Sequence, residues 1–169
     1  METLKSNLQK RLEGAKRIAL LAVGSSLRGD DAAGLLLAEK LRKTSLRKKN
    51  FKVFVGETAP ENMTGEVRRF KPTHVIIADC ADLGAKPGTA ALVDTKKTGI
   101  SGVTFSTHQL PMNILSSYLA QELSCEVILL GIQPRSLKFG GKPSKEIKAS
   151  VNRISSLLMK LLSQTQKFH

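Results

Sequence analysis

The chain has little of what marks a secreted or membrane-embedded protein. Its 169 residues include only two cysteines, too few for a disulfide framework or a cysteine-based zinc site. We expect both, Cys80 and Cys125, to be reduced and buried. No apolar run approaches the ~20 residues that span a bilayer, and the amphipathic N-terminal segment lacks the apolar core of a signal peptide. These absences predict a cytoplasmic protein with no membrane insertion.

Aromatic residues are also scarce, at 4% of the chain, whereas the formal net charge is +13. A basic protein can bind nucleic acid, but nucleic-acid modules commonly stack bases on aromatic side chains. The basic residues here are dispersed, and no nucleic-acid motif accompanies them. We therefore favour a solvated basic surface over a nucleic-acid interface. Such a surface would steer an acidic protein partner and make the association salt-sensitive.

Apolar runs alternate with helical patterns along the whole chain, which is typical of a parallel sheet with covering helices. We predict one domain over residues 1–169, with an N-terminal helix within 1–16 and an α/β core over 17–163. The core should be a doubly wound, mainly parallel twisted sheet of about five strands, with helices on both faces. The predicted strands are 18–23, 51–55, 74–79, 89–94 as an antiparallel edge, and 126–132. The predicted helices are 32–43, 61–70, one after Pro111, and a long last helix capped by Ser144.

Three polar residues follow apolar runs, at the end of the run or in the loop beyond it. Asp31 follows the first strand, Asp79 ends the run HVIIAD, and His108 follows GVTFSTH. Loops beyond the carboxyl ends of parallel strands share one edge of the sheet, where ligands bind. Two carboxylates and an imidazole there could bind a divalent transition metal with open positions, or perform acid/base chemistry.

The acidic residues and glycines of the first loop also fit roles other than metal binding. Asp30 and Asp31 could simply cap a helix, because acidic side chains are favoured at helix N-termini. Gly24, Gly29 and Gly34 could let the backbone approach a ligand, and a glycine-rich first loop suggests a nucleotide or phosphate. Their spacing is not GxGxxG, however, and no Walker lysine follows. The paired acids also disfavour an anionic ligand.

Several segments together resemble the hydrogenase maturation endopeptidases, from about Arg17 to about Leu162. GSSLRGDDAAG is similar to the opening signature of that family. HVIIADCADLGAKPGTAALVD, STHQLPMNILSSYL and EVILLGIQPRSLKFG resemble its later segments in the same order. GETAPENMTGEVRR resembles the middle segment of the subgroup that serves membrane-bound, hydrogen-evolving hydrogenases. The family has asparagine at the position of Ser25, whose hydroxyl cannot replace the paired donor and acceptor of an amide. We therefore leave Ser25 out of the site.

The resemblance implies a protease that removes a C-terminal extension from the large-subunit precursor of a [NiFe] hydrogenase. The metal-contacting residues of the family fall on Asp31, Asp79 and His108, which would be both catalytic and nickel-contacting. No permanently bound metal is implied, since the precursor supplies the nickel. The partner would be this precursor, alone or with its assembly chaperone, and the protein itself a monomer by default.

Two further functions are compatible with the same residues. A non-catalytic checkpoint module could bind nickel and leave the precursor uncut, and a phosphate- or nucleotide-binding α/β protein is the third candidate. Among peptidase chemistries, the sequence lacks the GxSxG elbow of serine hydrolases and the HExxH helix of zinc peptidases. Cys80 has no visible histidine partner. Metal-linked or acid/base hydrolysis therefore remains.

Overall fold

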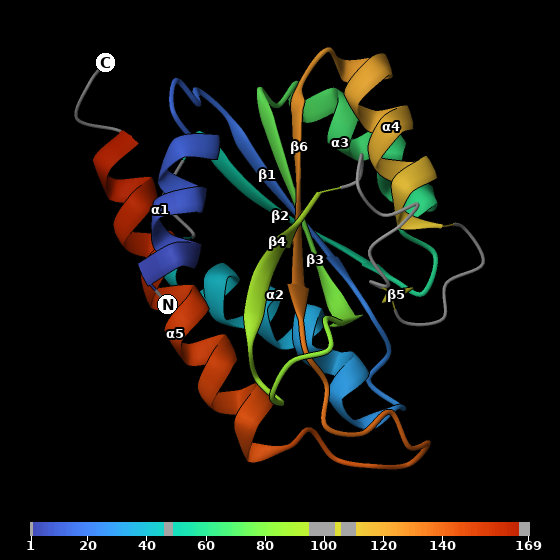
Figure 1. Ribbon diagram of the computed structural model, residues 1–169. Helices are drawn as coiled ribbons and strands as arrows, with labels where there is room; N and C mark the ends of the chain where they lie inside the picture. The colour runs from blue at the N-terminus through green and yellow to red at the C-terminus, as the bar shows by residue number, and fades with distance from the viewer. Residues whose placement is uncertain (1, 46–48, 95–103, 106–110, 166–169) are drawn as a thin grey trace.

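A computed structural model describes residues 2–45, 49–94, 104–105 and 111–165 (Figure 1). The α-helices are α1 (Glu2–Arg11), α2 (Ala33–Ser45), α3 (Thr64–Phe70), α4 (Met112–Leu123) and α5 (Lys145–Thr165), with 3-10 helices η1 (Gly29–Ala32) and η2 (Pro60–Met63). The strands are β1 (Ile18–Val23), β2 (Phe51–Glu57), β3 (His74–Asp82), β4 (Ala90–Val93), β5 (Thr104–Phe105) and β6 (Glu126–Ile132). In these parts of the chain, no helix has the length and apolar character needed to span a membrane.

The strands form one mixed sheet in the order β2-β1-β3-β6-β4, and β5 pairs with β3 outside this order. β2, β1, β3 and β6 run parallel. β4 is antiparallel to β6, and β5 is antiparallel to β3. The predicted α/β class, the mainly parallel sheet and its antiparallel edge strand are therefore confirmed.

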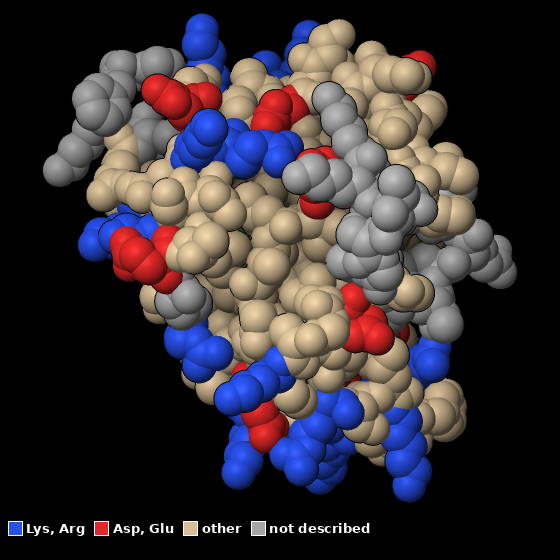
Figure 2. Space-filling model, viewed as in Figure 1, with Lys and Arg blue, Asp and Glu red and all other residues tan. Residues whose placement is uncertain are grey.

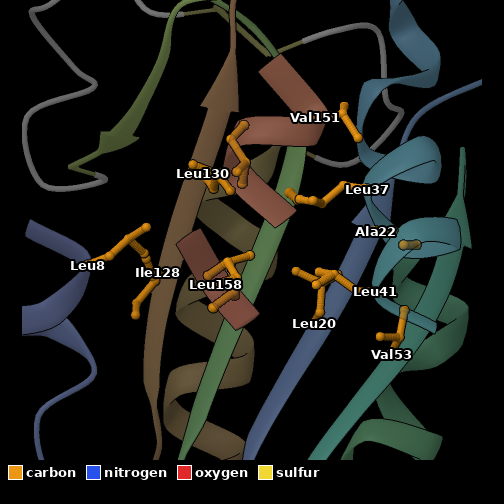
Figure 3. Packing of buried hydrophobic residues seen from close by; sticks show 14 of the residues in the cluster. Leu8, Leu20, Ala22, Leu37, Leu41, Val53, Ile128, Leu130, Val151 and Leu158 are labelled. Atoms are coloured by element: carbon orange, nitrogen blue, oxygen red, sulfur yellow. The ribbon is translucent and has the colours of Figure 1, made fainter. Parts of the chain in front are cut away.

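Helices cover both faces of the sheet, as Figure 1 shows. On one face, side chains of α1, α2 and α5 pack against the sheet, including Leu8, Leu37 and Leu158 (Figure 3). On the other face, Val67 of α3 and Leu115 of α4 belong to a second buried cluster. β1 is buried at all six of its positions, which explains why its sequence is continuously apolar rather than alternating.

The chain reverses its direction of travel across the sheet next to β1. After β1 it passes through α2 to β2 on one side, then through α3 to β3 on the other side of β1. α2 packs on the first face and α3 on the second. This is the topological switch point of a doubly wound sheet, where a crevice forms at the carboxyl ends of the two strands. The functional site is therefore expected beyond β1 and β3.

Several boundaries differ from the sequence prediction by one or more residues, and two of them have a clear structural cause. β3 continues three residues beyond Asp79 to Asp82, because its last residues, Ala81 and Asp82, pair with β5. The helix predicted at 61–70 begins as the 3-10 turn η2 and becomes α-helical only at Thr64. Ser144 caps α5 as predicted, since its Oγ accepts a hydrogen bond from the backbone N–H of Ile147 at 3.3 Å.

Candidate active site

The segment between β1 and α2 leaves the sheet at the switch point and folds back tightly on itself. Gly24 has φ of +137°, and a Cβ atom at this position would lie 1.9 Å from the carbonyl oxygen of Asp31. A side chain is therefore excluded by both conformation and space. The backbone N–H of Ser25 donates to that same carbonyl oxygen at 3.2 Å. The fold of this loop thus fixes the backbone at Asp31.

A second glycine brings α2 against the sheet. A Cβ atom at Gly34 would lie 2.3 Å from the carbonyl oxygen of Val23 and 2.4 Å from that of Ala78. Only glycine allows the start of α2 to sit directly on the end of β1 and the middle of β3. The sequence suggested that these glycines admit a ligand. At Gly24 and Gly34 the close approach is instead to the protein's own backbone, and its effect is to hold Asp31 near β3.

Asp31 is 2% exposed. Its Oδ1 atom has no hydrogen-bond partner among the residues that the structure describes. Leaving a carboxylate oxygen buried and unpaired is costly, and native proteins rarely do so without a reason such as a bound ion or substrate. This oxygen is therefore the clearest candidate for a contact with something outside the described protein.

Asp79 is fully buried and lies inside β3, opposite Gly131 of β6. The sequence placed it at the end of its strand, and the extension of β3 by pairing with β5 corrects this. Its Oδ1 accepts a 2.6 Å hydrogen bond from the backbone N–H of Cys80. By the two-residue period of a strand, Asp79 faces the side covered by α3 and α4. Its neighbour Cys80 faces α2 and α5.

Cys80 lies near three acidic residues. Burial raises the pKa of its thiol far above the ordinary range, and the charges of Asp79, Asp31 and Asp30 raise this pKa further. The thiol donates to the backbone carbonyl oxygen of Asp30 at 3.1 Å. A thiol held in its neutral form is a poor nucleophile. The buried, neutral thiol argues against a cysteine-protease mechanism, and both Asp31 and Asp79 lie near enough to Cys80 to act on its charge.

Asp30 has a different role from its neighbour, and not the helix-capping role suggested by its position. Its Oδ2 accepts hydrogen bonds from the backbone N–H groups of Arg135 at 2.7 Å and Ser136 at 3.2 Å, and from Ser144 Oγ at 3.0 Å. Its Oδ1 accepts one from the backbone N–H of Ser144 at 2.6 Å. The N-terminus of η1 receives no side-chain cap. Asp30 instead ties the β6–α5 loop to the first loop.

Gln133 lies at the start of the loop after β6, where its side chain contacts the loop that leaves β3. Its side-chain oxygen accepts from the backbone N–H groups of Leu83 at 2.7 Å and Ala85 at 3.2 Å. Its amide nitrogen donates to Asp82 Oδ1 at 3.3 Å. Gln133 therefore fixes the loop that leaves β3 shortly after Asp79. No pattern in the sequence indicated these contacts.

His108 lies outside the described residues, so its predicted place beside the two aspartates stays a prediction. Among the residues that are described, no group of three or more His, Cys, Asp and Glu side chains could hold a metal ion. Neither of the two cysteines is in a disulfide, as predicted. Cys80 is buried as expected, whereas Cys125 is only partly so.

Comparisons with known proteins agree with this architecture. The family model for the hydrogenase maturation protease matches residues 35–161. The hydrogenase 3 maturation protease of Escherichia coli is 38% identical over 135 residues, which cover 80% of this chain and 84% of that protein.

Two solved structures share the fold. The crystal structure of a [NiFe] hydrogenase maturation protease from Thermococcus kodakarensis superposes with a TM-score of 0.84 at 31% identity, covering 93% of this chain and 99% of that one. The solution structure of an Escherichia coli endopeptidase has a TM-score of 0.68 at 36% identity, covering 83% and 87%. Because the family model covers most of the chain and both the sequence and the fold match these proteins, the chain belongs to the hydrogenase maturation protease family and is an endopeptidase.

Proposed function

We propose that this endopeptidase removes the C-terminal extension from the nickel-loaded large-subunit precursor of a [NiFe] hydrogenase. The observation that carries the proposal is the buried Asp31 Oδ1, which has no partner in the described protein and lies in the neighbourhood of the fully buried Asp79. Carboxylate oxygen is a suitable ligand for nickel, and an imidazole from His108 would complete a set that leaves positions open for the substrate.

In this proposal the nickel belongs to the precursor. Asp31 and Asp79 supply negative charge at buried positions, where attraction to a divalent cation is stronger than in bulk water. The precursor would then bind tightly only when nickel is present. The enzyme would act in the cytoplasm on the precursor, alone or with its chaperone, and hold no metal of its own.

Two chemical routes to hydrolysis fit these residues. In the first, the substrate's nickel polarises the scissile carbonyl, and the aspartates hold the metal in place. In the second, Asp31 or Asp79 accepts a proton from the attacking water, and His108 donates one to the leaving amine. If Asp79 is the base of the second route and only Asp31 and His108 hold the nickel there, an Asp79→Asn variant separates the two routes. The first route predicts weakened precursor binding, whereas the second predicts normal binding with a slow cut.

The experiment mixes the enzyme with the precursor, with and without nickel, and weighs the precursor by mass spectrometry. We expect loss of one C-terminal fragment only in the nickel-loaded sample. The Asp31→Asn variant should leave the precursor intact, whereas Glu66→Gln, an exposed carboxylate on α3, should cut normally. If the nickel-loaded precursor stays whole but co-purifies with the wild-type enzyme, the protein is a checkpoint module and the proposal is wrong.

A further inference from the structure

Two loops at the carboxyl edge of the sheet join into one body, which we call the basic lobe and define as residues 24–29 and 133–144. The backbone N–H of Asp30 donates to the Ser136 carbonyl at 3.0 Å. The backbone N–H of Gly140 donates to the Leu27 carbonyl at 2.8 Å. The Asp30 carboxylate adds its four hydrogen bonds to the same loops. The lobe is therefore fixed in place before any partner arrives.

The lobe carries two apolar side chains in solvent. Phe139 is 74% exposed and Leu27 is 61% exposed, and both are among the most exposed large hydrophobic residues of the described chain. The hydrogen bond from the backbone N–H of Gly140, the residue after Phe139, to the carbonyl of Leu27 brings the backbones at Phe139 and Leu27 close together. Exposed apolar groups on a rigid surface mark interaction sites, and aromatic side chains are frequent anchors in them.

The charge of the lobe has one sign. Its residues include Arg28, Arg135, Lys138 and Lys142 but no aspartate or glutamate. Lys138 and Lys142 are exposed, while Arg135 pairs with Glu146 at 2.7 Å. Figure 2 shows Lys and Arg gathered along the lower edge of the molecule, where Figure 1 places the loop after β6. An acidic surface is the complement of this lobe.

The lobe also borders the crevice. Leu27 lies four residues before Asp31, and the backbone N–H of Asp31 donates to the Arg28 carbonyl at 3.1 Å. A protein held on the lobe would therefore lie next to the buried carboxylates. We propose that the basic lobe is a docking site, separate from the cleavage site, for an acidic segment of the precursor that bears an apolar side chain. This proposal rests on the proposed function.

Docking of this kind changes the concentration at which the enzyme saturates, and leaves the cutting step itself unchanged. We therefore expect the double variant Leu27→Ser with Phe139→Ser to raise KM for the nickel-loaded precursor about tenfold while kcat stays the same. The double variant Lys138→Glu with Lys142→Glu should also raise KM about tenfold at low salt. This second effect should shrink near ~1 M salt, where charges are screened within about 3 Å.

Matched controls lie elsewhere on the surface. Ile114→Ser removes a side chain on α4 that is 51% exposed. Lys10→Glu with Lys160→Glu changes the net charge by the same amount, on exposed positions of α1 and α5. Both controls should keep the wild-type KM, and every variant should keep the wild-type melting temperature because only exposed side chains change.

The outcomes separate the docking site from the proposed function. Wild-type KM in the Leu27/Phe139 variant, with wild-type cutting intact, overturns the docking site alone. If Lys10→Glu with Lys160→Glu raises KM as much as Lys138→Glu with Lys142→Glu does, the attraction depends on net charge alone. This result also overturns the docking site. Dimerisation of the wild type that the Leu27/Phe139 variant loses would assign the lobe to a second copy. If the wild type cuts no precursor, the proposed function fails, and a binding measurement on the same variants still tests the lobe.

Discussion

Replacing either of two adjacent residues, Asp30 or Asp31, by asparagine should have opposite effects: the first change should lower stability, and the second should abolish processing. In Asp30→Asn, one of the two carboxylate oxygens becomes an NH₂ group that faces a backbone donor. At best the three hydrogen bonds to Oδ2 survive without their charge, and the 2.6 Å bond from the Ser144 N–H is lost. A lost hydrogen bond to a charged group costs about 1.5–3 kcal/mol, and an unsatisfied buried donor about 1–3 kcal/mol. We expect a loss of about 3 kcal/mol.

Asp31→Asn should have a small effect on stability, because the Oδ1 that it alters has no partner in the described protein. Removing a buried negative charge beside Asp79 and Asp30 should leave the free energy of unfolding within about 1 kcal/mol of wild type, or raise it. The same change should abolish processing. Asp30→Asn should in turn still cut the precursor at temperatures where it remains folded.

Urea unfolding followed by circular dichroism measures both free energies, and mass spectrometry of the precursor measures processing. In a protein of this length, a loss of about 3 kcal/mol lowers the melting temperature by about 6–12 °C. The reasoning fails if Asp30→Asn costs less than about 1 kcal/mol. It also fails if Asp31→Asn unfolds the protein, because Asp31 would then be a structural residue.

Three further predictions concern other positions. Gly34→Ala should lower the free energy of unfolding by about 3 kcal/mol or prevent folding, because the added Cβ would lie 2.3 Å from a backbone oxygen. Urea unfolding tests this. Lys71→Gly should raise the free energy of unfolding by about 0.5–1 kcal/mol in the same assay. Lys71 has φ of +52° at the C-terminus of α3, and glycine adopts this left-handed backbone conformation without strain. Burial lowers the pKa of His74 in the folded protein below its usual value of about 6.5. The unfolded chain therefore binds this proton more tightly than the folded protein does. Stability should therefore fall as pH drops below about 6.5, and His74→Gln should flatten this slope in denaturation curves at pH values of about 5.5 and 7.5.

Patterns within short segments predicted much of the fold. The bounds of β1 and β6 were predicted from their continuous apolar runs, because strands buried on both faces need such runs. The antiparallel edge strand and the Ser144 cap were also readable from local sequence. The end of β3 was not, because a pairing with β5, more than twenty residues later, determines it.

The sequence names candidate site residues, and their roles stay predictions, whereas the contacts around them could not be read from it. Asp31 and Asp79 followed from their position beside apolar runs and from the motif resemblance. The role of Asp30 depends on backbone groups of Arg135, Ser136 and Ser144, and no local pattern reveals partners so distant. Gly24 and Gly34 looked like residues of a ligand-binding loop. The sequence shows that these positions have no side chain, but it does not show that the protein's own backbone occupies the space a side chain would need.

The contacts of Asp30 also set when the crevice can form during synthesis. Its partners lie 105 to 114 residues later in the chain, and α5, which begins just after them, is needed to cover the same face of the sheet. While the ribosome is still making the middle of the protein, the Asp30 carboxylate has none of these donors. The loop that carries Asp31 can therefore take its final shape only when almost the whole polypeptide is available. A nascent or truncated chain that ends before residue 144 should have no cutting activity.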